Sequence, residues 1–145
     1  SHLHLPVDVL VSKSLVKPVD VAVRPVGRIN PDEYIIDIGP DTILLFSKII
    51  KTARMTVWNG SLGLAEIYAF KTGSLNVAQA LINSFGEKIV GGGDLITFLA
   101  SEKILDKMTY VSTGGGAMLE FLAGENLPGV EILEDKDNSH PLICS

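Results

Sequence analysis

Short apolar runs alternate with amphipathic stretches along most of the chain. The runs are of strand length, rich in Val and Ile, and most end beside Gly, Pro, Asn or Ser, which favour turns. We expect strands at 7–11, 19–26, 34–38, 55–58, 88–90 and 108–111. Pro18 and Pro25 lie at the margins of the second run, which therefore favours a sheet edge or a loop.

Helical periodicity follows several of these runs. Pro40 suits the first position of a helix, and apolar residues continue at helical spacing from Ile43 to Ile50. Asp37 precedes this helix, and we expect its carboxylate to cap it. Two later helices are expected at about 94–102 and 117–123.

A further helix is predicted by an amphipathic stretch near the middle of the chain. Thr72 and Ser74 are both capping types ahead of it. Its apolar face is formed by Val77, Ala78, Leu81 and Ile82.

The alternation of strands and helices predicts an α/β fold. We expect three layers, with a mostly parallel, doubly wound (Rossmann-like) sheet covered by helices on both faces. The chain enters its first strand without a preceding element, which fits either a complete doubly wound domain or a sheet that is incomplete at its amino-terminal end. We expect residues 1–133 to form a partial domain of this kind and the polar residues 134–145 to form a carboxy-terminal tail.

Composition narrows the functional classes. The chain has 145 residues, of which 46% are hydrophobic and 20% charged, which suits one folded domain. A net charge of −5 disfavours a partner that is a nucleic acid. No apolar run reaches membrane-spanning length and no leader opens the chain, so neither insertion nor export is expected. The single Cys144 forms no internal disulfide, and a cytoplasmic location is the natural expectation.

The turn at Gly91, Gly92 and Gly93 joins a strand to a helix that begins near Asp94. Glycines let backbone amides approach a ligand, and a helix amino terminus favours anions. A carboxylate there repels a bare phosphate but suits a phosphate that carries Mg²⁺. The alternative is that Asp94 is only a helix cap and the glycines only make a tight turn.

A second turn of this kind contains Gly114, Gly115 and Gly116 after Ser112 and Thr113. Both turns follow parallel strands, and ligands bind at the carboxyl edge of such sheets. Neither turn matches GxxxxGK[ST] or GxGxxG, so standard phosphate-loop enzymes and dinucleotide dehydrogenases are excluded. Together the turns indicate an anion or nucleotide site.

A third strand-end loop runs from Trp58 through Asn59 to Glu66. The Asn59 amide can both donate and accept, and the Glu66 carboxylate can accept hydrogen bonds from ribose hydroxyls. The plainer interpretation makes Trp58 a core residue, Asn59 part of a turn and Glu66 a solvated side chain. The residues alone leave both interpretations open.

Six motifs, read in order, resemble the phosphoglycerate kinase family. The resemblance covers about residues 5–131, nearly the whole chain. The motifs are Leu5-Pro6-Val7-Asp8, Asp37-Ile38-Gly39-Pro40, Val57-Trp58-Asn59-Gly60, Gly91-Gly92-Gly93-Asp94, Val111-Ser112-Thr113-Gly114-Gly115-Gly116-Ala117 and Leu127-Pro128-Gly129-Val130.

The resemblance implies a role for each loop. Glu66 resembles the family's ribose-binding carboxylate, and Asn59 a nearby nucleotide-site residue. Asp94 resembles the ligand of the Mg²⁺ that accompanies ADP or ATP. The turn at 91–93 resembles the phosphate-side turn, and the turn at 114–116 the helix end that stabilises the phosphoryl group in transfer.

The sequence departs from the family pattern at three positions. Leu95 stands where the family usually has Thr or Ser, whose hydroxyl meets a phosphate; only its backbone amide would remain to bind the cofactor. Ser61 stands where the family usually has proline, and Ala65 where it usually has phenylalanine. These changes bear on the affinity for nucleotide.

The resemblance also implies what the chain lacks. Residues 1–133 correspond to part of the carboxy-terminal, nucleotide-binding domain, without the amino-terminal domain that binds 3-phosphoglycerate and without the family's phosphate-binding lysines. We therefore expect no turnover by this chain alone, and self-association where the full-length enzyme is monomeric. The alternatives are a stand-alone or a degenerate nucleotide-binding module without catalysis.

Overall fold

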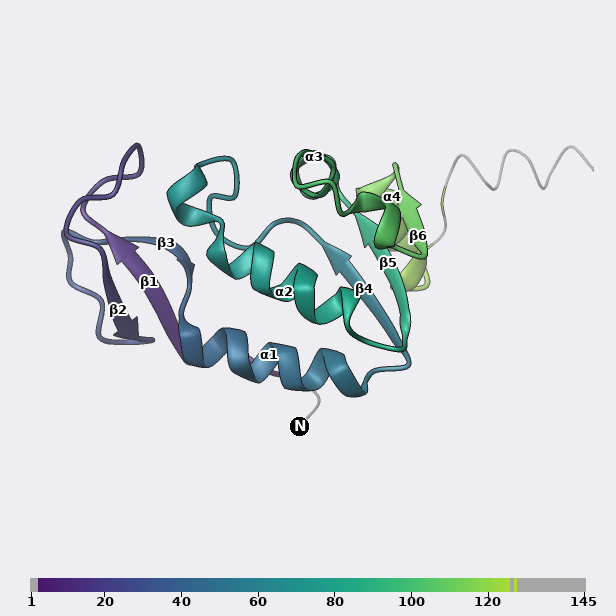
Figure 1. Cartoon of the computed structure of the whole chain (residues 1–145), viewed down its shortest axis with the longest axis horizontal. Helices are drawn as coiled ribbons and strands as arrows, with labels where there is room; N and C mark the ends of the chain where they lie inside the picture. Colours follow the sequence, from purple (N-terminus) through teal and green to yellow (C-terminus); the bar gives the residue numbers. More distant parts are fainter. Residues whose placement is uncertain (1–2, 126, 128–145) are drawn as a thin grey trace, which may run out of the picture.

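The computed structural model describes residues 3–125 and 127 and contains six strands and four α-helices in that range (Figure 1). The expected domain boundary at 133 and the tail at 134–145, with Cys144, lie outside the described residues. In chain order the elements are β1 (Asp8–Ser12), β2 (Ala22–Pro25), β3 (Tyr34–Ile38), α1 (Pro40–Thr52), β4 (Met55–Asn59), the 3₁₀ turn η1 (Tyr68–Phe70), α2 (Thr72–Ile82), β5 (Glu87–Gly91), α3 (Gly93–Ser101), the 3₁₀ turn η2 (Leu105–Lys107), β6 (Tyr110–Ser112) and α4 (Gly115–Leu122).

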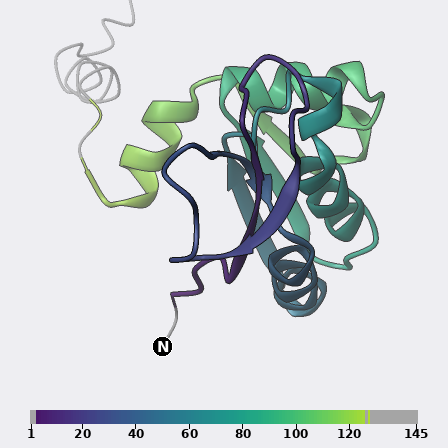
Figure 2. The same cartoon turned by 90° about the vertical axis from the view of Figure 1, so that its left-hand side faces the viewer.

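A parallel sheet with the order β4-β5-β6 forms the second half of the fold. Asn59 pairs with Gly91, and Gly91 pairs with Ser112, so the three strands end level with one another. In Figure 2, α4 lies on the opposite side of this sheet from α1 and α2. The predicted α/β class with a parallel sheet is confirmed.

The first three strands lie outside the parallel part of the expected mostly parallel sheet. They form a separate antiparallel sheet with the order β2-β1-β3. The connections 13–21 and 26–33 contain no helix. Parallel neighbours need a crossover, usually helical, of a dozen or more residues, so these short connections lead to antiparallel pairing instead. The edge position expected for 19–26 is confirmed, because β2 pairs only with β1 in the described structure.

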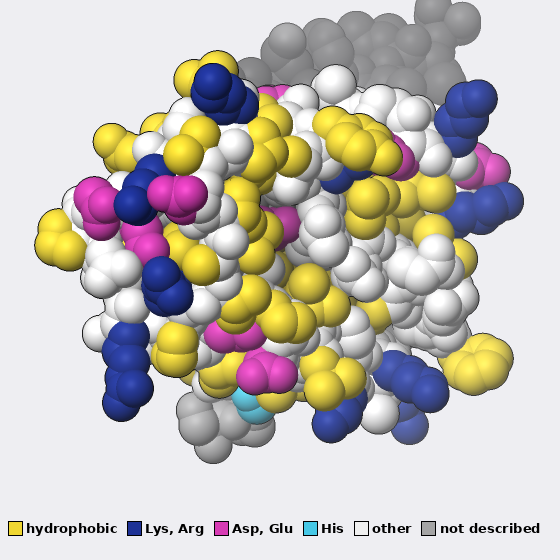
Figure 3. Space-filling view, turned by 60° about the vertical axis from the view of Figure 1, so that its left-hand side comes forward, with side chains coloured by type: hydrophobic (Ala, Val, Ile, Leu, Met, Phe, Trp, Pro, Cys, Tyr) yellow, Lys and Arg dark blue, Asp and Glu magenta, His cyan; other side chains and the backbone are white. Residues whose placement is uncertain are grey.

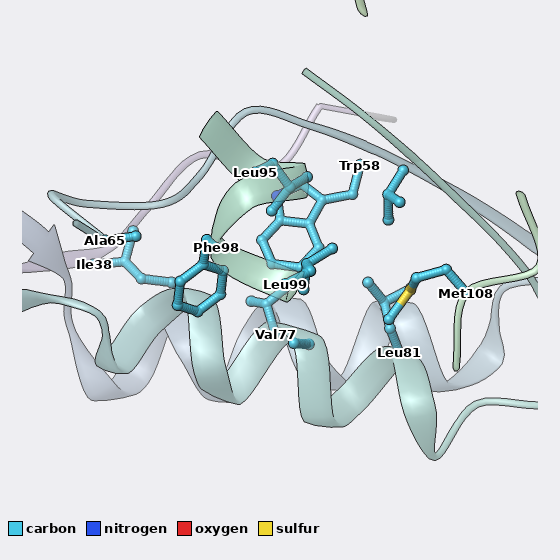
Figure 4. Close-up of a cluster of buried hydrophobic side chains, with 11 residues drawn as sticks. Ile38, Trp58, Ala65, Val77, Leu81, Leu95, Phe98, Leu99 and Met108 are labelled. Carbon is cyan, nitrogen blue, oxygen red and sulfur yellow. The ribbon is translucent and has the colours of Figure 1, made fainter. Parts of the chain in front are cut away.

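The main core lies between the parallel sheet and helices α2 and α3 (Figure 4). Trp58 from the end of β4 packs there with Leu95 and Phe98 from α3 and with Leu81 from α2. The side chain of Leu95 is completely buried. This packing holds the amino-terminal turn of α3 at the end of the sheet.

The expected cap of α1 is wrong. The carboxylate that caps α1 belongs to Asp8 of β1, which accepts from the Asp41 amide (3.1 Å) and the Thr42 amide (2.8 Å) and from the Thr42 hydroxyl (2.7 Å). Asp37 instead accepts from the Gly73 amide (2.7 Å) at the start of α2. Sequence adjacency pointed to Asp37, but strand β1 brings Asp8 closer to the helix end.

The caps expected for α2 are also wrong, because this helix has no side-chain cap at its first residue. The Ser74 hydroxyl faces the loop after β4, where it accepts from the Leu62 amide and donates to the Leu62 carbonyl, both at 2.8 Å. Ser74 therefore ties that loop to α2.

Candidate functional site

Three strand-end turns meet at the carboxyl edge of the parallel sheet. The Asn59 side-chain amide donates to the Gly115 carbonyl (2.8 Å), which joins the turn after β4 to the start of α4. The Gly60 amide donates to the Gly91 carbonyl (3.4 Å), which joins the same turn to the end of β5. The three turns therefore form one surface, as the parallel pattern predicted.

Three of the six glycines in the two glycine-rich turns lie close to neighbouring groups or have a special backbone conformation. A Cβ on Gly115 would lie 2.7 Å from the Gly92 backbone nitrogen, and one on Gly91 would lie 2.7 Å from the end of the Met118 side chain. Gly92 has a φ of +93°, which side-chain-bearing residues rarely adopt. Close backbone approach explains Gly115, and the positive φ explains Gly92, without a ligand, whereas the flexible Met118 side chain can move away from a Cβ on Gly91.

The other three glycines face free space. A Cβ on Gly93 or Gly116 would meet nothing within 4 Å, and one on Gly114 would meet only Ala117 at 3.8 Å. Packing alone therefore does not require glycine at these positions. Their open backbone is where a bulky anion could approach the two turns.

Both helices present amide groups at this surface. The first helical hydrogen bond of α3 runs from Ile96 to Gly92, and that of α4 runs from Met118 to Gly114. The amides of 93–95 and 115–117 precede these bonds and have no partner within their helices. Two helix amino termini side by side favour a ligand with several negative charges.

A pocket of about 530 Å³ lies between the loop after β4 and α3. Glu66 lines it from the loop, and Asp94 lines it from the first turn of α3. Both carboxylates belong to exposed residues. The structure thus brings together the two acidic residues that the resemblance assigns to the ribose and to the metal.

The loop that carries Glu66 is held on both sides. The Leu64 amide donates to the Ile36 carbonyl of β3 (3.0 Å), and Ser74 holds Leu62 from α2. A Cβ on Gly63 would lie 2.5 Å from the Ile36 carbonyl oxygen, so the loop passes directly against β3. These contacts place Glu66 at the pocket.

Asp37 adds a buried carboxylate beneath this loop. Burial raises its pKa, and the hydrogen bonds from the Gly73 and Ile38 amides oppose that rise. The same carboxylate lies against Gly63, where a Cβ would approach it to 2.8 Å. Asp37 therefore has a structural role under the loop that the sequence analysis did not assign.

Two of the expected site residues have side chains that are engaged elsewhere. Leu95 is buried in the core, so only its backbone amide can face the pocket. Asn59 uses its amide group to join two turns. Ser61, by contrast, lines the pocket, where the family usually has proline.

The sequence analysis did not find a charged pair in the same pocket. Lys71 and Glu102 both line it and form a salt bridge, and the Lys71 ammonium lies 4.3 Å from the centre of the Tyr68 ring. The paired residues are 31 positions apart, and no periodic pattern links them. Their encounter depends on how α2 and α3 pack.

The acidic groups fit a magnesium ion held partly by a ligand, and not a metal held by protein alone. No group of three or more His, Cys, Asp or Glu residues that could hold a metal occurs in the described part of the chain. Mg²⁺ usually takes one or two carboxylates and completes its shell with waters and phosphate oxygens. Asp94, beside two helix amino termini, suits that arrangement.

None of the helices described is long and apolar enough to span a membrane.

Comparison with known proteins gives a consistent result. The family model of phosphoglycerate kinase matches residues 1–125. The chain is 42% identical to the phosphoglycerate kinase of Desulfosudis oleivorans over 132 residues, which covers 91% of this chain and 33% of that protein.

Solved structures show the same relationship. The phosphoglycerate kinase of Coxiella burnetii superposes with a TM-score of 0.83 and 41% identity, covering 92% of this chain and 34% of the other. That of Pyrococcus horikoshii gives 0.75 and 33%, covering 89% and 32%. The chain spans about a third of the length of these relatives. The turns, their order along the chain and these matches together show that the chain belongs to the phosphoglycerate kinase family.

Proposed function

We propose that this chain is the ADP- and ATP-binding part of a phosphoglycerate kinase and binds the nucleotide, with Mg²⁺, at the carboxyl edge of the β4-β5-β6 sheet. The observation that carries the proposal is a pocket lined by Glu66 and by Asp94 in the first turn of α3, beside the open amino terminus of α4, whose Gly115 lies against Gly92. Either feature alone is common, whereas together they match the charge distribution of a magnesium nucleotide.

Each group has a defined task in this proposal. The amides at the starts of α3 and α4 donate to phosphate oxygens, and Gly93, Gly114 and Gly116 leave room for them. The Glu66 carboxylate accepts hydrogen bonds from the ribose hydroxyls. Asp94 would hold Mg²⁺, which neutralises part of the phosphate charge.

The reaction is that of the complete enzyme, in which a phosphoryl group passes between 1,3-bisphosphoglycerate and ADP. Such transfers depend on positioning and on stabilising charge at the migrating group. The starts of α3 and α4 supply fixed donors for that charge. This chain covers 33% of the length of one such relative; we propose that 3-phosphoglycerate is bound by a part of the complete enzyme outside that third, and we expect no turnover by the chain alone.

Calorimetric titration tests the binding site. The chain should bind ADP in the presence of Mg²⁺, and Glu66→Gln should weaken ADP binding about tenfold, because a neutral amide oxygen accepts a weaker hydrogen bond than a carboxylate does. Pyrophosphate has no ribose, so its binding should not change. Glu120→Gln, which neutralises an exposed carboxylate on α4, is the matched control.

Two results would contradict the proposal. One is the absence of ADP binding at millimolar concentration with Mg²⁺ present, which would indicate a degenerate module. The other is an equal loss of ADP and pyrophosphate affinity in Glu66→Gln, which would place Glu66 away from the ribose.

A further inference from the structure

The pocket is lined in part by an ion pair that the proposed reaction does not use. The Lys71 Nζ lies 2.5 Å from the Glu102 Oε1, and the two side chains are only 13% and 25% exposed. The same ammonium lies over the Tyr68 ring. Partial burial makes this pair less screened by solvent than the exposed pair of Asp106 and Lys107.

The pair joins the two elements that carry the candidate ligand-binding groups. Lys71 follows η1 and immediately precedes α2, so it ends the segment that contains Glu66. Glu102 follows the last residue of α3, the helix that carries Asp94 in its first turn.

Helix stability does not account for Glu102. A carboxylate at the carboxyl end of α3 lies at the negative end of the helix dipole, where it is unfavourable. Lys71 offsets that cost only by reaching across from the neighbouring segment. The pair is therefore explained by the elements that it connects.

We propose that Lys71 and Glu102 are positioning residues whose ion pair sets the separation between the Glu66 loop and α3, and so adjusts the pocket to a ligand that binds both. This inference rests on the proposed function, because it assigns the nucleotide to that pocket. The ribose and the magnesium–phosphate end of one ligand must reach Glu66 and Asp94 together. Movement of either wall therefore weakens binding of the whole nucleotide more than binding of its phosphate part.

Amide hydrogen exchange tests the pairing without any ligand. The Ile67 amide donates to the Leu64 carbonyl (2.9 Å) and the Phe70 amide to the Ile67 carbonyl (2.8 Å), so both report on opening of the Glu66 segment. Lys71→Glu and Glu102→Lys should each lower protection at these amides roughly fivefold. The double variant, in which the charges are exchanged, should restore most of it.

Exchanging the exposed pair, by Asp106→Lys with Lys107→Asp, is the matched control and should leave these amides unchanged. The proposal is overturned if neither single variant alters protection at Ile67 and Phe70. It is equally overturned if both lower it and the charge exchange restores nothing, because pairing would then not be the cause.

Titration with Mg²⁺ and ADP gives the second readout. Each single variant should weaken ADP binding roughly fivefold while pyrophosphate binding changes less, and the charge exchange should restore ADP binding. If the affinity for ADP depends only on the charge at residue 71, and the charge-exchanged double variant does not restore it, then Lys71 contacts the ligand directly and the positioning role is wrong. If the unaltered chain binds no ADP, the proposed function fails. The amide hydrogen-exchange measurements then still decide whether the ion pair holds the Glu66 segment.

Discussion

At the residue scale, glycines that look equivalent in the sequence have different surroundings. Gly115 touches the backbone of the neighbouring turn, whereas Gly116 faces free space. The repeated triplets predicted a tight turn beside a ligand, and the position of the turns is confirmed. The sequence does not distinguish the packed glycines from the open ones, because that depends on contacts between turns far apart along the chain.

Alanine at these two positions should therefore have different effects. Gly115→Ala places a methyl group 2.7 Å from backbone, and overpacking of this kind should cost about 1–3 kcal/mol of unfolding free energy. Gly116→Ala should leave stability unchanged or raise it slightly, because alanine favours helix. Urea denaturation of both variants measures the difference, and equal stabilities would contradict the contact between the two turns.

Leu95 shows a second limit at this scale. The family usually has Thr or Ser at this position, with a hydroxyl that meets a phosphate. On that ground, Leu95→Thr would be expected to strengthen nucleotide binding. The buried side chain predicts the opposite outcome: a loss of about 2–4 kcal/mol of unfolding free energy, because core volume is lost and a hydroxyl is buried. Thermal melting checks this, and a variant of unchanged stability with tighter ADP binding would show that the side chain can turn toward the pocket.

At the element scale, strands and helices were mostly predictable because each has its own periodicity. Helix α1 begins at Pro40 and β3 spans 34–38, as predicted. The caps were not predictable, because Asp8 reaches α1 from a strand that is distant in sequence. The antiparallel pairing of β1 to β3 was missed for a related reason, since it depends on connections that contain no helix.

The Asp8 cap gives a pH-dependent prediction. Burial opposes ionisation of Asp8, but the hydrogen bonds from Thr42 and Asp41 outweigh it and lower its pKa. The ionised cap therefore stabilises the fold above the unfolded pKa of about 4, and this contribution is lost as the pH falls through the lower folded value. Asp8→Asn should cost about 0.5–2 kcal/mol at pH 7.

The difference between Asp8→Asn and the unaltered chain should shrink as the pH falls well below 4. Melting curves from pH 7 downward measure it. The low pKa of Glu33, held at about 2 by Arg24, affects both proteins equally and cancels in the comparison. A difference that is constant across this range would show that the Asp8 charge does not act in the cap.

At the scale of the whole molecule, apolar surface remains exposed. β4 pairs with a strand on one side only in the described structure, and an apolar groove of about 420 Å³ lies between it and helices α1 and α2. Figure 3 shows hydrophobic side chains across one face, with charged side chains gathered mainly toward its edges. Unpaired strand edges beside apolar surface favour association with another chain.

The isolated chain should therefore self-associate with rising concentration. Met55, at the start of β4, is 53% exposed, and Met55→Lys should reduce association because lysine at a strand edge disfavours pairing. Leu119→Lys adds the same charge on α4 and serves as the control. Sedimentation equilibrium measures the molar mass of all three proteins in solution. If the unaltered chain stays monomeric at every concentration measured, the prediction is contradicted.

The central claim is that Asp94 acts through a magnesium ion at the nucleotide phosphates, and not merely as part of a helix end. The direct measurement is the affinity for ADP, with and without Mg²⁺, in the unaltered chain and in Asp94→Asn. We predict that Mg²⁺ strengthens binding to the unaltered chain about tenfold or more, and that most of this gain disappears in Asp94→Asn while the melting temperature changes little. Loss of stability in Asp94→Asn with an intact magnesium dependence would contradict the claim and leave Asp94 as a structural residue of α3.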